Sequence, residues 1–286
     1  MSLFFVDSGC DLGFEQIKKL GVESLNLNYA INDKVFEFNS EFDYDKFYSK
    51  FKKGVCVSAS PMTEDEYISV FEPCLKQGDD IVYVHSGDKI MNLDNLFSAR
   101  NKLLEKYTER KFELINSSNF SIGQGLVSFE CALLYRKGFS ATEIYERSFD
   151  IRNNYAIYFA CDSLEQLSNN NLVDSNLVAG TALNIKPILT LDIDGNIELV
   201  DKVSGRKKAI TKLIEICRQK GKNIADNPIG IVYSSDINLA EELKNKIIEL
   251  FGEETTIFFE RMSPSNAAIV GNNMIGLAFS IVKKKL

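Results

Sequence analysis

The stretch at residues 111–138, KFELINSSNFSIGQGLVSFECALLYRKG, contains the clearest strand, turn and long apolar helix of the chain. Phe112, Leu114 and Ile115 predict a short strand, and four Asn and Ser residues at 116–119 predict a turn. A helix then follows up to Gly138, with almost no polar face until its last turn. We therefore expect a central helix that other elements cover on most sides.

Gly123 and Gly125 stand at the start of this helix, where each lowers helix propensity by roughly 1 kcal/mol. Close approach of another group is the usual reason for such glycines. Three alternatives remain open: a neighbouring backbone packs on them, an apolar ligand passes beside them, or a phosphate binds at the helix N-terminus. The G-x-G spacing lacks the third glycine and the lysine of the nucleotide-binding motifs.

Three segments in the first half of the chain repeat the order of apolar strand, polar loop and helix. The expected strands are 54–57, 81–84 and 114–115, and the polar loops that follow them are 58–61, 85–88 and 116–119. Successive units of this kind indicate a parallel sheet. An apolar run at 3–6 that ends in Asp7 is how such a domain begins, and a first helix is expected at 14–20.

Polar loops at the carboxyl ends of parallel strands should share one site, because ligands of open parallel sheets bind there. We therefore expect Ser58, Ser60, Ser86 and residues 116–118 to converge. The alternative is that these side chains only cap helices.

Two hairpins are also predicted. Strands at 25–29 and 34–38 flank Asn32 and Asp33, and a helix is expected at 43–52. Strands at 185–191 and 197–200 flank Asp194 and Gly195, an arrangement foreign to a simple parallel sheet.

The sequence is therefore typical of an α/β protein with two α/β domains. We expect an N-terminal domain at 1–160 with a parallel sheet and flanking helices, and a C-terminal domain at 161–286 with a mixed or antiparallel sheet and helices. The later elements expected are helices at 206–220 and 239–251 and strands at 230–233, 255–259 and 275–282.

Composition excludes several classes of protein. With 286 residues, 45% hydrophobic and 26% charged, the chain can bury a full core. Its 33 basic and 40 acidic residues give a net charge of -7, and Lys283, Lys284 and Lys285 form its only basic arm, so nucleic acid is not expected as a partner.

Localisation is expected to be cytoplasmic. The six cysteines show no C-x-x-C spacing and several stand within apolar runs, as reduced core cysteines do. The N-terminus MSLFFVDSG has no positive region and reaches Asp7 after few apolar residues, which argues against a signal peptide or membrane anchor. No apolar run is long enough to span a bilayer.

No catalytic set is apparent. The single histidine, His85, precedes Ser86, but neighbours in sequence do not make a nucleophile and its base. There is no G-x-S-x-G or H-E-x-x-H motif and no cluster with metal-ligand spacing, so neither a metal nor another cofactor is expected. Hydroxyl-bearing loops above an apolar helix suit an amphiphile with one polar end, such as a fatty acid.

The basic segment at Lys202, Arg206, Lys207 and Lys208 follows the second hairpin. It is interpreted either as a solvated helix start or as a surface that binds an acidic partner or an anion.

The sequence resembles the DegV family of bacterial fatty-acid-binding proteins over nearly its whole length. The most specific match is L-N-I-K-P-I-L at 183–189 followed by Asp194 and Gly195. The basic segment, the opening F-V-D-S at 5–8 with C-D-L at 10–12, and Asn116, Ser117, Ser121, Gly123 and Gly125 are similar to further family motifs.

The resemblance implies two α/β domains with a lipid tunnel between them, and a carrier that presents the acyl carboxylate to a fatty-acid kinase. The family binds the carboxylate with a T-S-Q-P loop and an S-S-x-L-S-G-T loop, which correspond here to 58–61 and 85–87. The residues expected to bind the carboxylate are thus Ser58, Ser86, Ser60 and Gly87. Those expected along the acyl chain are Gly123, Gly125, Leu126, Ile269, Val270 and Gly271, and Arg206 and Lys207 are expected partner contacts.

The sequence also departs from the family pattern. The second loop lacks S-G-T and is lengthened between Gly87 and Ser98, Ile269 stands where the family has a histidine, and Ser204 replaces an arginine. Two alternatives follow: a divergent member that binds another apolar ligand, or an enzyme that acts on a small anion with His85 and nearby aspartates.

Overall fold

A computed structural model of the chain describes residues 2–179 and 184–282. Of the features quoted above, Leu183 and the three lysines at 283–285 lie outside the described residues.

The first half of the chain forms a four-stranded parallel sheet in the order β2-β1-β6-β7. Its strands are β1 (Ser2–Asp7), β2 (Glu23–Leu25), β6 (Asp80–His85) and β7 (Phe112–Asn116). Side chains alternate between the two faces of each strand, so that Phe5 packs with the helices on one face while Phe4 and Val6 face the centre of the molecule.

The second half forms a six-stranded mixed sheet in the order β10-β9-β8-β13-β11-β12, in which only β11 and β12 pair in parallel. Its strands are β8 (Tyr155–Cys161), β9 (Ile185–Leu191), β10 (Ile197–Ser204), β11 (Ile229–Tyr233), β12 (Ile257–Arg261) and β13 (Met274–Ser280). The predicted hairpin around Asp194 and Gly195 is confirmed as β9 and β10.

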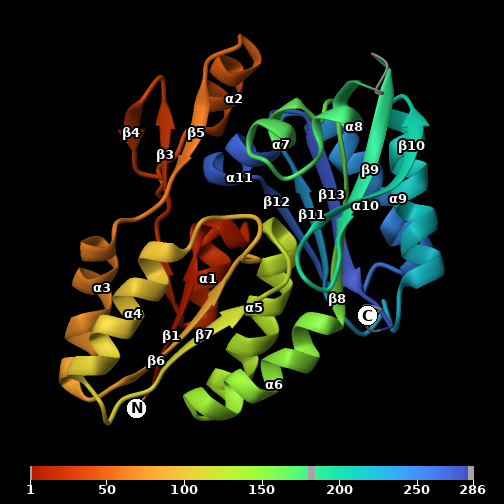
Figure 1. Cartoon of the computed structure of the whole chain (residues 1–286). Coiled ribbons are helices and arrows are strands. Elements are labelled where there is room, and N and C mark those ends of the chain that lie inside the picture. Colours follow the sequence, from red (N-terminus) through yellow and green to blue (C-terminus); the bar gives the residue numbers. More distant parts are fainter. Residues whose placement is uncertain (1, 180–183, 283–286) are drawn as a thin grey trace.

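The two sheets and their helices form successive layers (Figure 1). Helices α3 (Glu64–Gln77) and α4 (Asp94–Lys106) cover the outer face of the parallel sheet. Between the sheets lie η1 (Ser8–Cys10), α1 (Phe14–Leu20), α5 (Ser121–Arg136) and α6 (Ala141–Asn153). The outer face of the mixed sheet is covered by α9 (Arg206–Lys220) and α10 (Ile237–Phe251).

The predicted central helix is confirmed as α5. All of its residues from Ser121 to Ser128 are buried, because it contacts β1 and β6 on one side and β8, β11 and β13 on the other. The predicted fold class, with a parallel sheet, a mixed sheet and flanking helices, is likewise confirmed. The division at 160 and 161 stays a prediction; the mixed sheet itself begins with β8, at Tyr155.

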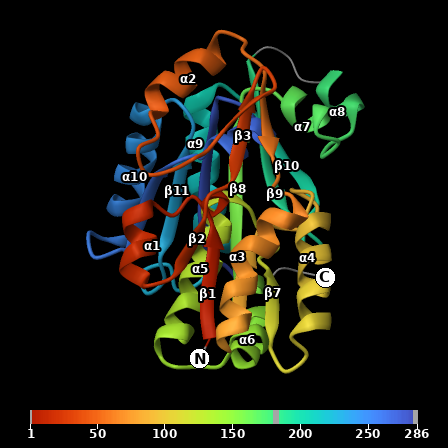
Figure 2. The same ribbon diagram turned by 90° about the vertical axis from the view of Figure 1, so that its left-hand side faces the viewer.

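A small antiparallel sheet, β4-β3-β5, projects with α2 (Tyr44–Lys52) at one end of the molecule (Figures 1 and 2). Its strands are β3 (Asn28–Ile31), β4 (Lys34–Phe36) and β5 (Val57–Ser60). The hairpin predicted at Asn32 and Asp33 is confirmed, and both residues have positive φ, as a type I′ turn requires.

The prediction of a strand at 54–57 that belongs to the parallel sheet was wrong. The strand is β5, which begins at Val57 and pairs antiparallel with β3 as far as Ser60 opposite Asn28. The polar residues read as a loop are therefore strand residues, and the units of the parallel sheet are those of β1, β6 and β7.

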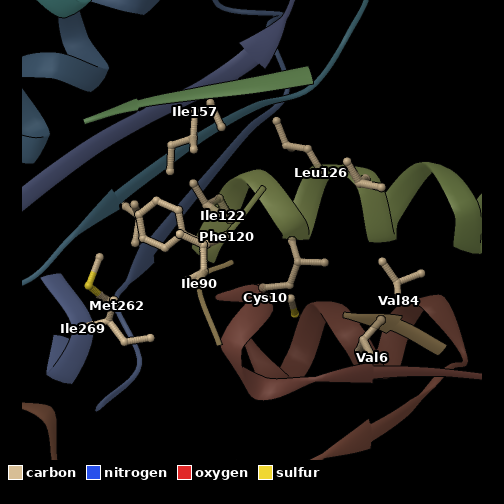
Figure 3. Packing of buried hydrophobic residues seen from close by; sticks show 14 of the residues in the cluster. Val6, Cys10, Val84, Ile90, Phe120, Ile122, Leu126, Ile157, Met262 and Ile269 are labelled. Atoms are coloured by element: carbon tan, nitrogen blue, oxygen red, sulfur yellow. The ribbon is translucent and has the colours of Figure 1, made fainter. Parts of the chain in front are cut away.

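One hydrophobic cluster runs through the centre of the molecule and joins both halves (Figure 3). It includes Phe120, Ile122 and Leu126 of the α5 region and Ile269 of α11 (Pro264–Val270). Two short helices, α7 (Glu165–Asn169) and α8 (Ser175–Ala179), follow β8 near the projecting sheet.

Candidate ligand-binding site

Buried polar side chains lie at the carboxyl edge of the parallel sheet. Asp7 ends β1 and accepts hydrogen bonds from the Gly9 amide (2.9 Å), the Tyr83 hydroxyl (2.8 Å) and the Gln124 amide (3.2 Å). Burial raises the pKa of Asp7 to about 6, although these donors lower it. Its carboxylate is thus occupied by protein groups.

The loop after β6 places Ser86 and Gly87 in the interior. The Gly87 amide donates to the Asn119 carbonyl oxygen at 2.7 Å, which ties this loop to the turn before α5. The Ser86 side chain is 3% exposed, and its Oγ has no hydrogen-bond partner among the residues that the structure describes. A buried hydroxyl without a partner costs about 1–3 kcal/mol.

His85 does not form a catalytic pair with Ser86. Its Nδ1 lies 2.7 Å from the Ser86 carbonyl oxygen and 3.6 Å from Asp88 Oδ1, whereas the Ser86 hydroxyl has no described partner. Burial lowers the pKa of His85. The pair therefore lacks the hydrogen bond by which a general base activates a serine.

Ser58 and Ser60 belong to β5 of the projecting sheet and not to a parallel strand, and only Ser58 lines the cavities described here. Ser58 is exposed and Ser60 is half-buried. Ser58 lines two cavities that also share Asn170, one of about 660 Å³ and one of about 540 Å³. The structure thus brings Ser58 to the cleft between the small sheet, the loop after β6 and the segment after α7.

The larger cavity combines polar and apolar walls. Besides Ser58 and Asn170, its lining comprises Ala59, Pro61, Asp88, Lys89, Ile90, Met91, Asn92, Leu93, Asp94, Phe97, Leu172 and Ile269. Sequence reasoning placed Ser58 and Ile269 in the site but missed Lys89, Ile90 and Phe97. The segment after Gly87 supplies much of this wall.

The residues expected along the acyl chain fall into two groups. Ile269 lines the larger cavity, and Val270 and Gly271 line the smaller one. Gly123, Gly125 and Leu126 lie instead in the buried interior of α5. Ile90 and Ile269 connect the two groups, because both line the larger cavity and belong to the central hydrophobic cluster (Figure 3).

Close packing accounts for both glycines of α5. A Cβ atom at position 125 would lie 2.6 Å from the Cys10 carbonyl oxygen, and one at 123 would lie 3.1 Å from Ile157 Cβ. The space beside the glycines is therefore taken by η1 and β8. Their part in an acyl tunnel stays a prediction, as do the other site assignments.

Ion pairs within the protein offset part of the positive charge of the basic segment. Arg206 pairs with Asp162, and with Asp236 at 3.2 Å, so its charge is offset, whereas Lys207 is exposed. The buried Lys186 also pairs with Asp162, at 2.9 Å. Lys207 is thus the more accessible of the two residues expected to contact a partner.

Within 2–179 and 184–282 no group of three or more His, Cys, Asp and Glu side chains is placed to bind a metal ion. In the same residues, none of the helices is both long and apolar enough to cross a membrane.

Comparison with known proteins gives the relatives of the chain. A DegV domain-containing protein of Clostridium perfringens is 29% identical over 253 residues, which cover 87% of each chain. The crystal structure of a DegV family protein from Ruminococcus gnavus with vaccenic acid has a TM-score of 0.84 at 21% identity and covers 97% of this chain and 99% of that one. The fatty acid kinase (Fak) B3 protein of Streptococcus pneumoniae, loaded with linoleic acid, has a TM-score of 0.82 at 19% identity and covers 99% and 100%.

These solved structures share the fold of the chain. Its family membership rests on the sequence match. The profile of the DegV family, described as an uncharacterised protein family, matches residues 4–282. The predicted resemblance is confirmed, because the match spans nearly the whole sequence: the chain belongs to the DegV family.

Proposed function

We propose that this protein is a carrier that binds one long-chain fatty acid, and that it is not an enzyme. The carboxylate lies near Ser58 and Ser86, with Ser60 and Gly87 beside them, and the acyl chain follows α5 into the core. The observation that carries this proposal is the buried Ser86 hydroxyl, which has no described partner and lies shortly before the segment at 88–94 that lines the larger cavity.

A carboxylate oxygen would supply the missing partner. A hydroxyl that donates to an ionised carboxylate makes a stronger hydrogen bond than one to a neutral acceptor. Because Ser86 lies directly before the loop that lines the larger cavity, a ligand that passes Ile90 can bring its polar end to this hydroxyl.

The apolar part of the ligand would lie among the side chains of the central cluster. Ile90 and Ile269 form the entrance, and Phe120, Ile122 and Leu126 continue inwards along α5. Burying about 15 methylenes gives a gross gain on the order of 12 kcal/mol before ordering costs, at ~0.8 kcal/mol each. This gain opposes the cost of separating the packed side chains.

The relatives support the same ligand class. Vaccenic acid and linoleic acid, named with the Ruminococcus gnavus and Streptococcus pneumoniae structures, each join a carboxyl group to a long apolar chain. The site described above offers one polar group at the start of an apolar path, which matches that chemistry.

Native mass spectrometry of the purified protein, followed by organic extraction, tests the proposal. We expect one released fatty acid per chain, or a one-to-one complex after addition of a long-chain fatty acid. A protein that neither carries nor accepts such an acid would contradict the carrier function.

The variant Ser86→Ala should change the stability of the free protein and its affinity for the fatty acid in opposite directions. The free protein should become about 1 kcal/mol more stable, because a buried hydroxyl without a partner is removed. Affinity for the fatty acid should fall about fivefold or more, because the carboxylate loses a donor. Urea unfolding and isothermal titration calorimetry measure the two effects.

Ser128→Ala is the matched control, since Ser128 Oγ is also buried without a described partner, but farther along α5. It should raise stability similarly and leave affinity unchanged. Equal affinities for Ser86→Ala and Ser128→Ala would refute the placement of the carboxylate.

We further propose that the carrier presents the carboxylate to a fatty-acid kinase. The likeness to the Fak B3 protein and the exposed Lys207 near Arg206 support a partner surface. Formation of an acyl phosphate from the bound acid, ATP and such a kinase is the expected readout, and it should weaken in Lys207→Glu.

A further inference from the structure

Lys89 lies in the loop after β6 and lines the larger cavity together with Ser58 and Ile269. Its side chain is exposed and forms no ion pair with any residue in 2–179 or 184–282. It is the only cation among the described residues that line this cavity. Its charge is therefore available to a ligand.

Two acidic side chains, Asp88 and Asp94, share the lining. Asp88 precedes Lys89, and its Oδ1 lies 3.6 Å from His85 Nδ1. Asp94 is in the first turn of α4, where the helix dipole stabilises a carboxylate. Without Lys89 the lining would carry two negative charges and no positive one, which would repel an anionic head group.

The turn between β9 and β10 lies close to the Lys89 stem. A Cβ atom at Gly195, in the turn between β9 and β10, would lie 4.0 Å from Lys89 Cγ and 4.0 Å from Gly87 Cα. The hairpin turn therefore lies next to the first half of the lysine side chain. Its ammonium end remains free to move on a flexible stem.

On the basis of the proposed function, we propose that Lys89 is a specificity-determining residue of the site. Its ammonium group makes the cleft prefer an ionised carboxylate over an uncharged amphiphile of the same chain length. Ser86 would supply a hydrogen bond to either ligand, since an alcohol oxygen also accepts one. Only the acid gains from the charge of Lys89.

The test compares a long-chain fatty acid with the alcohol of the same length in wild-type, Lys89→Gln and Lys89→Arg proteins. Lys137→Gln is the matched control, because Lys137 is also exposed but follows the far end of α5. Displacement of a fluorescent lipid at low salt measures each affinity above the pH at which the acid ionises.

We expect Lys89→Gln to weaken binding of the acid about three- to tenfold and to leave binding of the alcohol unchanged. Lys89→Arg and Lys137→Gln should behave as wild type. The effect of Lys89→Gln should shrink in about 0.5 M salt, because salt screens an exposed charge.

Three results would overturn the inference. An unchanged ratio of acid to alcohol affinity in Lys89→Gln would remove the role of the charge. An equal loss for both ligands would show that Lys89 acts through packing. If wild-type protein binds neither ligand, the proposed function fails and this inference fails with it, whereas the first two results leave the carrier function intact.

Discussion

Asp11 joins three elements that lie far apart in the sequence. It follows η1 and accepts hydrogen bonds from the Ser121 hydroxyl of α5, the Ser263 amide (2.8 Å) and the Asn266 side chain (2.8 Å). Burial raises the pKa of Asp11 to about 6, although these donors lower it. Asp11 therefore links the first turn of the chain to both α5 and α11.

Among the hydrogen-bond donors to Asp11, Asn266 is the best one to test by a single substitution. It is buried, and its Nδ2 donates to the Gly9 carbonyl oxygen (2.7 Å) as well as to Asp11. Asn266→Ala leaves both acceptors without this donor, so the free energy of unfolding should fall by about 2–4 kcal/mol. Urea unfolding measures the change.

Ser265→Ala is a control from the same helix, since the Ser265 hydroxyl contacts only the Ser263 hydroxyl, at 3.3 Å, among the described hydrogen bonds. It should cost about 1 kcal/mol or less. Equal losses in the two variants would contradict the importance of the Asp11 group.

At the scale of elements, α5 depends on its glycines for close contact with η1. Gly125→Ala would improve helix propensity by about 1 kcal/mol, but its Cβ would meet the Cys10 carbonyl oxygen at 2.6 Å and Leu12 Cγ at 3.0 Å. Because backbone must move, we expect a net loss of about 1–3 kcal/mol in the free energy of unfolding.

Gly123→Ala is the informative comparison. Its Cβ would meet side-chain atoms of Asn119 and Ile157 at 3.1 Å, and a shift of a few tenths of an ångström would relieve these contacts. Its loss should be smaller than that of Gly125→Ala in thermal and urea unfolding. A larger loss of stability in Gly123→Ala than in Gly125→Ala would show that the contact with η1 is not what requires glycine at position 125.

The strand β5 shows how an element can differ from its local pattern. The run at 54–57 is apolar enough for a strand, and Ser58 and Ser60 suit a loop equally well. Ser58 and Ser60 are strand residues in the structure, because β3 pairs with β5 as far as Asn28 opposite Ser60. Pairing between strands is not encoded in either strand alone.

At the scale of the whole molecule, three carboxyl groups, two buried and one half-buried, make stability depend on pH. Burial raises the pKa values of Asp7 and Asp11 to about 6, and burial together with Asp11 raises that of Glu260 to about 7. In the unfolded chain these groups titrate near 4. The folded protein therefore binds more protons than the unfolded chain between about pH 4 and pH 7.

The free energy of unfolding should accordingly rise as pH falls from about 8 to about 5. The stabilisation is complete below the unfolded pKa values and is lost as pH rises through 6 to 7. Each group contributes at most about 3 kcal/mol. Urea unfolding at several pH values measures the slope.

Asp7→Asn should flatten this pH dependence, whereas Glu109→Gln, at an exposed position, should leave it unchanged. A free energy of unfolding that falls steadily between pH 8 and pH 5 would contradict the sign of the effect.

Much of the fold could be predicted because its signals are local. The α5 sequence has no polar face, so it had to be central, and the residue pairs Asn32-Asp33 and Asp194-Gly195 placed two hairpins. The site was predicted less completely. Ser58 and Ser86 were expected from their polar loops and Ile269 from resemblance to a family motif, whereas nothing local marks Lys89 or Ile90 as lining a cavity.

The sequence by itself determined the α/β class, the two kinds of sheet and the buried central helix, since these follow from periodicity and turn chemistry within short segments. Only the tertiary structure decided that β5 leaves the parallel sheet, that Ser86 is buried without a described partner, and that Lys89 and Ile269 line one cavity. Cavities and unfilled hydrogen bonds arise where distant segments meet, and the free energy of such contacts depends on every segment that packs there.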